Sequence, residues 1–136
     1  MKEIITAIMI WVGANTHFDT NHPIPTVIFL PQEQLNSMYF KDNEHDPESL
    51  HGMYNKENDI IYLRDDWDRR DPWDLGVLTH EIVHYLQDIN NMQFQCSREM
   101  ERDSWPIQKE YLKSVHNFNW EYDKLWYIMI STCDQF

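Results

Sequence analysis

Cysteine, glycine and basic residues are all scarce in this sequence, and each scarcity excludes a class of protein. Two cysteines, Cys96 and Cys133, are too few for a disulfide scaffold, and their pattern does not fit a zinc ribbon. Only three glycines argue against collagen-like and turn-dense repeat architectures. With 11 Lys and Arg against 23 Asp and Glu, the net charge is −12. This charge repels phosphate groups, so we expect no binding to nucleic acids or to anionic membranes.

The sequence also lacks a long apolar run. The apolar stretch at residues 4–14 has about eleven residues, too few for a helix to span a bilayer. It resembles the short apolar core of a signal peptide, but Glu3 precedes it, and we interpret it as a buried first helix. The compartment stays open at this stage, either cytoplasmic or exported.

What the chain does have is enough apolar material for one core. Hydrophobic residues make up 42% of the 136 residues, so we treat residues 1–136 as a single domain. Hydrophobic periodicity and turn residues predict helices at 2–14, 32–39, 73–88 and 120–131, with Ser97 capping a further helix. They also predict a strand at 26–30, an acidic loop at 41–50 and a hairpin at 51–63. This order predicts an α+β fold, in which a small antiparallel sheet of about three strands packs against helices.

The long helix at 73–88 contains the motif His80-Glu81-Ile82-Val83-His84. Histidines four residues apart on a helix project from one face, close enough for both rings to bind a single zinc ion. Glu81 is rotated by about 100° from His80, so it flanks the metal and acts as general base on the water that zinc activates. Chance alone gives about 0.03 such motifs in a chain of this composition. The motif therefore predicts one zinc ion.

A catalytic zinc site needs a third protein ligand, and several downstream residues compete for this position. Glu101 is our first choice because it precedes Ser104 by three residues, an arrangement that lets a ligand helix pack closely. Asp103 is the alternative, followed by Glu99, although both also suit a helix N-terminus. His116 is the only later histidine.

Several segments resemble an uncharacterised family of small single-domain HExxH proteins from bacteria and phages, which are similar to minimal gluzincin metallopeptidases. The resemblance lies in four segments: WVGANT at 11–16, IIYL at 60–63, LTHEIVHYLQ at 78–87, and the pattern from Cys96 through Glu101-x-x-Ser-Trp to Gln108. It implies a zincin-like fold, with His80, His84 and Glu101 as ligands and Glu81 as base. It also implies that Cys96 pairs with Cys133, whereas the residues alone allow two buried free thiols.

Pro106 departs from the expected ligand helix. It lacks a backbone N–H and crowds the carbonyl of Arg102, so the helix is expected to kink, or to restart at Ser104 and leave Glu101 in a turn. Further positions are assigned by their location beside the presumed ligand or by residue type. Gln108 is a candidate to orient a ligand, and the candidates to stabilise an oxyanion are Tyr111, Tyr127 and His116.

These features predict a zinc-dependent hydrolase, in particular a small gluzincin-type metallopeptidase. A peptide or protein substrate is expected to pair with the strand from Ile60 to Leu63, because strand addition tolerates many sequences. The alternative is a catalytically silent module for binding or interaction that zinc stabilises on the same fold.

Overall fold

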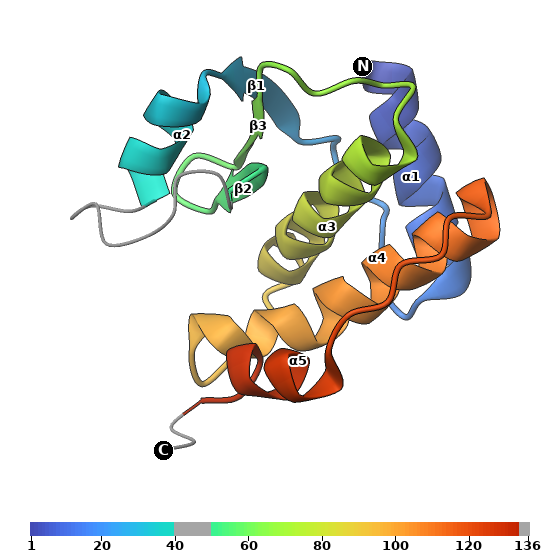
Figure 1. Ribbon diagram of the computed structural model, residues 1–136, viewed down its shortest axis with the longest axis vertical. Helices are drawn as coiled ribbons and strands as arrows, with labels where there is room; N and C mark the ends of the chain where they lie inside the picture. The colour runs from blue at the N-terminus through green and yellow to red at the C-terminus, as the bar shows by residue number, and fades with distance from the viewer. Residues whose placement is uncertain (40–49, 134–136) are drawn as a thin grey trace.

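The structure, a computed structural model, describes residues 1–39 and 50–133 and has a mixed α+β architecture (Figure 1). The class is as predicted, while the acidic loop expected at 41–50 lies outside the described residues except for Leu50. The elements in chain order are α1 (Lys2–Asn15), β1 (Thr26–Leu30), α2 (Gln32–Tyr39), β2 (Gly52–Asn55), β3 (Ile60–Arg64), α3 (Pro72–Ile89), the 3₁₀ helix η2 (Ser97–Met100), α4 (Glu101–His116) and α5 (Lys124–Ile130).

The three strands form a mixed sheet in the order β1-β3-β2. β2 and β3 form the predicted antiparallel hairpin, but β1 runs parallel to β3, with Thr26 opposite Ile60. The expectation of a purely antiparallel sheet is therefore wrong. It follows from this order that β3 is hydrogen-bonded on both sides and offers no free edge. The prediction that a substrate pairs with the strand from Ile60 to Leu63 is also wrong.

Helix α3 lies at the centre of the fold, with the sheet on one side and α1 on the other (Figure 1). The Asp71 side chain accepts a hydrogen bond from the Trp73 N–H, and Pro72 occupies the first turn, so the helix begins as its sequence predicts. The interior of α3 is almost entirely buried. Its apolar residues join α1 and β3 in one core, whose members include Ile8, Val12, Ile61, Leu63, Leu78, Ile82 and Leu86.

Helix α1 is a packed part of this core, as the sequence predicts, and Ile5, Ile8, Met9 and Val12 form its buried face. No helix in the described ranges combines the length and the hydropathy needed to cross a bilayer.

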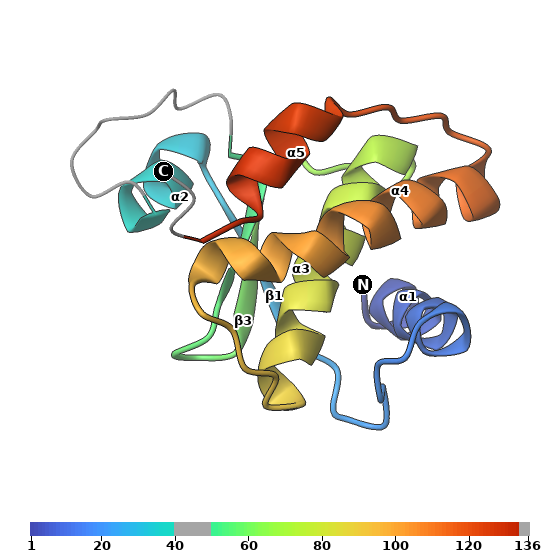
Figure 2. The ribbon, with the colours of Figure 1, turned by 90° about the horizontal axis from the view of Figure 1, so that it is seen from below.

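Helix α4 crosses α3 closely (Figure 2). Their contact depends on Gly76, because a Cβ atom there would lie only 2.9 Å from a methyl carbon of the buried Leu112. The absence of a side chain at Gly76 thus lets α4 approach the helix that carries the HExxH motif.

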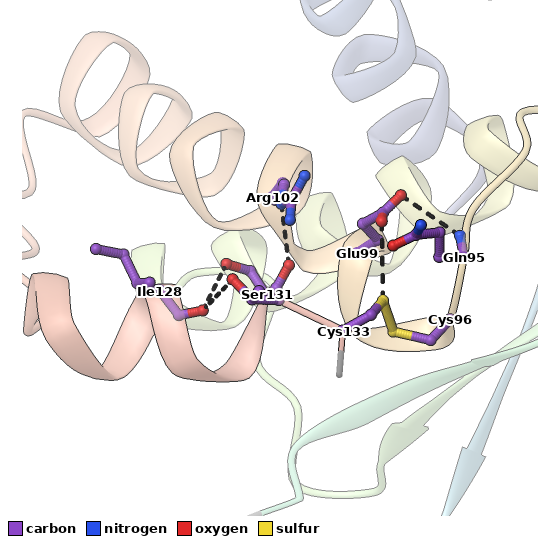
Figure 3. The surroundings of a disulfide bond; sticks show 8 residues. Gln95, Cys96, Glu99, Arg102, Ile128, Ser131 and Cys133 are labelled. Atoms are coloured by element: carbon purple, nitrogen blue, oxygen red, sulfur yellow. Dashed lines mark hydrogen bonds between the residues drawn. A yellow bond between two sulfur atoms is a disulfide. The ribbon is translucent and has the colours of Figure 1, made fainter. Parts of the chain in front are cut away.

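The C-terminal segment is tied back to the start of α4 by the disulfide Cys96–Cys133, with a Cα–Cα distance of 6.0 Å (Figure 3). The pairing implied by the family resemblance is confirmed. The bond closes a loop of 37 residues, which contributes about 3–4 kcal/mol in a chain-entropy treatment. The last helix is shorter than the predicted 120–131, because Asp123 caps its start by accepting from the Trp126 N–H.

Candidate metal centre

Three predicted ligands meet at one point between α3 and α4. The Nε2 atoms of His80 and His84 lie 3.1 Å apart, and each lies 3.1 Å from an oxygen of the Glu101 carboxylate. Ligands at 2.0–2.1 Å in a tetrahedral site are separated by about 3.3 Å. The spacing and the donor set of two nitrogens and one oxygen therefore fit a divalent metal such as zinc. In the described part of the chain, no other group of three His, Cys, Asp or Glu side chains has such spacing.

The short connection between α3 and α4 places Glu101 opposite the two histidines. Asn91 adopts a left-handed conformation with φ of 56° just after α3, which turns the chain back. Ser97 does not cap the next helix as predicted; it begins η2, and α4 starts only at Glu101. Glu101 thus lies in the first turn of a helix that packs against α3.

Two glutamine side chains orient the histidine rings through hydrogen bonds to their Nδ1 atoms. His84 donates from Nδ1 to the Gln87 side-chain oxygen at 2.9 Å, and His80 donates from Nδ1 to the Gln108 side-chain oxygen at 2.8 Å. The Gln87 amide nitrogen donates to the Met100 carbonyl at 2.8 Å, so its oxygen must face His84. In their neutral forms both histidines consequently direct Nε2 lone pairs at each other and at Glu101. Such a cluster needs a cation, either a proton or a metal ion.

The charges of the cluster reflect this need. Burial disfavours a charge on His84, but the Glu101 and Glu81 carboxylates outweigh it and raise the pKa of His84 to about 9. Burial also acts against ionisation of Glu101, yet its hydrogen bonds to His80 and His84 hold the pKa of that carboxyl far below its usual range. The Ser104 hydroxyl donates to the same carboxylate at 2.9 Å. Glu101 is therefore an anion, and contacts from both α3 and α4 fix the orientation of its carboxylate.

Glu81 lies beside the triad on α3 and is only 7% exposed. Burial raises the pKa of Glu81, although the nearby His80 and His84 and a hydrogen bond from the Tyr54 backbone N–H act in the opposite direction. A buried carboxylate with a raised pKa next to a candidate metal site is suited to accept a proton.

Pro106 does not make α4 restart, because the helix is continuous from Glu101 to His116. Of the two alternatives expected at Pro106, the restart at Ser104 is therefore wrong. Ser104 itself is fully buried, as expected for the small residue at this position of the pattern.

The other candidates do not join the triad. Asp103 accepts from the Gln87 amide at 3.3 Å, and Glu99 lies beside the disulfide (Figure 3). His116 ends α4, more than about 20 Å from Glu101 along a helix of 16 residues, and interacts with the Tyr111 hydroxyl at 3.0 Å. The Tyr127 hydroxyl donates to the Arg102 carbonyl at 2.7 Å. Neither the alternative third ligand nor the three proposed oxyanion groups contact the triad.

Sequence reasoning found Gln108 but missed Gln87, which is completely buried. The available signal was its spacing, since Gln87 follows His84 by three residues and so lies on the same face of α3. Gln87 also links His84 to the Met100 carbonyl, directly before Glu101.

We expect Gln87→Leu to lower the zinc affinity by about 10- to 100-fold, the usual cost of losing a partner behind a metal ligand. The effect should exceed that of Gln108→Leu, because Gln87 also holds the Met100 carbonyl. Competition titration with a chromophoric chelator measures both affinities, with the exposed Gln93→Leu as the matched control. Wild-type affinity in Gln87→Leu contradicts this prediction.

Comparison with known proteins gives a family but no activity. Neither the curated proteins nor the solved structures contain a match to this chain. A family model described as Domain of unknown function (DUF6647) matches residues 1–135, which is nearly the whole sequence, and the chain therefore belongs to this family.

Proposed function

We propose that the protein is a zinc-dependent hydrolase, a small metallopeptidase of the gluzincin type. His80, His84 and Glu101 would hold one zinc ion, which would polarise a peptide carbonyl and activate a water molecule for attack on it. The observation that carries the proposal is the convergence of three potential ligand atoms, each about 3.1 Å from its neighbours, with a buried carboxylate beside them.

Glu81 acts as the proton carrier. Its side chain takes a proton from the attacking water and passes it to the leaving amine. Burial raises the pKa of Glu81, which favours the uptake of a proton by this carboxylate. Gln108 and Gln87 keep the protons of His80 and His84 on Nδ1, so that the Nε2 atoms remain available for the metal.

The sheet edge that an extended substrate could pair with is β2, not the central strand β3. Within the described ranges β2 pairs with β3 alone. The Arg64 N–H donates to the His51 carbonyl, and the alternation of an antiparallel ladder then turns the backbone groups of Gly52 and Tyr54 away from β3. The Tyr54 N–H already donates to Glu81, so the Gly52 backbone and the Tyr54 carbonyl are the groups open to a substrate strand. A Cβ atom at Gly52 would lie 3.4 Å from Cγ of Glu81, so this edge borders the candidate base. We propose that an extended peptide pairs there.

The alternative is a zinc-stabilised binding module without turnover. The location of Glu81 favours the hydrolase. A purely structural metal site needs no buried carboxyl beside it, and the burial of this carboxyl costs free energy of desolvation.

A digest of a broad peptide mixture tests the proposal. We expect cleavage by the zinc-loaded protein, loss of cleavage with a chelator, and recovery when zinc is added back. Stoichiometric zinc without any cleavage would support the binding module, and a protein that takes up no zinc would contradict the metal centre itself.

A further inference from the structure

The first turn of α4 carries both Glu101 and a defect in its hydrogen bonding. In a regular helix the N–H of residue 106 donates to the carbonyl of Arg102, but Pro106 has no N–H to donate. The carbonyl left without a helical partner belongs to the residue directly after Glu101. The turn that presents this ligand therefore lacks one backbone hydrogen bond unless another donor supplies it.

Helix α5 supplies that donor. The Tyr127 hydroxyl donates to the Arg102 carbonyl at 2.7 Å, a normal length for a hydrogen bond from a hydroxyl. The Arg102 side chain also donates from Nε to the Ser131 carbonyl at 3.0 Å, as Figure 3 shows. α5 thus binds Arg102 at both its backbone and its side chain.

The position of Tyr127 is itself restrained. Its ring packs on Trp105 and Tyr122, with centroids 6.2 and 5.3 Å away. Beyond α5, Cys133 is bonded to Cys96, which immediately precedes η2. The disulfide therefore keeps α5 against the segment that leads into Glu101 (Figure 3).

We propose that Tyr127 is a positioning residue for the metal centre. Its hydroxyl substitutes for the amide proton that Pro106 lacks, and so holds the Arg102 peptide and the preceding Glu101 in place. The Glu101 carboxylate must stay about 3.1 Å from both His80 and His84, so a small movement of this turn weakens the site. This role rests on the metal centre of the proposed function and does not depend on turnover.

A double-mutant cycle between Tyr127→Phe and Pro106→Ala tests the role. Tyr127→Phe keeps the ring and removes the hydroxyl, and we expect it to lower the zinc affinity by about tenfold. In the double variant Tyr127→Phe/Pro106→Ala the new N–H donates to the Arg102 carbonyl, so the affinity should return close to the wild-type value. Tyr122→Phe, in the same aromatic cluster, is the matched control and should bind zinc like the wild type.

The midpoint of unfolding of the metal-free variants is the second measurement. It should fall in Tyr127→Phe and recover in the double variant, which a general loosening of α5 would not produce. An unchanged zinc affinity in Tyr127→Phe overturns the positioning role, and so does a double variant as weak as the single one. A wild-type protein that binds zinc but cleaves no peptide contradicts the hydrolase alone.

Discussion

Glu81→Gln is expected to abolish hydrolysis while leaving the zinc content unchanged. General-base catalysis contributes about 10²- to 10⁴-fold to a rate, and glutamine cannot accept the proton. The metal should remain, because Glu81 is not part of the ligand triad. The folded state should also tolerate the change, since burial already disfavours the charged form of this carboxyl and raises its pKa.

Initial rates on the best peptide from the digest, together with the zinc content of each preparation, measure this effect. Glu99→Gln is the matched control, because this carboxylate lies beside the disulfide and outside the triad. Wild-type turnover in Glu81→Gln would exclude the proposed mechanism. Loss of zinc together with activity would show instead that Glu81 supports the metal.

The sequence predicted the centre of the site because the signal is local. A helix of regular periodicity fixes the relative direction of His80, Glu81 and His84, and no tertiary information is needed to place them on one face. Glu101 follows from the family pattern together with the spacing to Ser104, and Gln108 from its position beside this presumed ligand. The structure brings both to the histidines. Their contacts depend only on two helices that a short connection folds together.

The arrangement of the sheet could not be predicted in the same way. The pattern of Thr26–Leu30 identifies β1 as a strand, but its direction depends on the path of the chain between β1 and β3. A hairpin alone does not show which of its strands is central. The sequence therefore suggests β3 as the edge that binds substrate. In the structure β1, from a distant part of the sequence, pairs with β3 and covers that edge.

The C-terminal end illustrates a second limit. Apolar and aromatic residues at 120–131 follow a helical pattern, yet Trp120 and Tyr122 belong to an aromatic cluster with Trp105 rather than to α5. Similarly, Pro106 on its own predicts a kink or a restart of the helix. The Tyr127 hydroxyl that bonds the Arg102 carbonyl lies 21 positions further along the chain, so the local sequence does not reveal it. Long-range partners of single residues leave no periodic signal.

The largest expected effect on metal binding comes from a substitution within the triad. Glu101→Ala is expected to lower the zinc affinity by more than the roughly 10- to 100-fold cost of losing an outer partner, because Glu101 supplies a ligand atom itself. A carboxylate in this position would sit about 2.0–2.2 Å from the ion. The remaining two-histidine site would hold zinc weakly, since catalytic sites use three protein ligands.

The other acidic residues of this region provide the controls. Asp103→Ala removes only a contact to the Gln87 amide at 3.3 Å, and Glu99→Ala removes a side chain near Cys133, so both should keep close to one zinc per chain. His116→Ala should also keep its zinc, because His116 interacts with Tyr111 at the far end of α4. Zinc content after dialysis of the four variants against a weak chelator measures the difference. Full occupancy in Glu101→Ala would remove Glu101 from the site, and a loss in Asp103→Ala would transfer the third ligand to that residue.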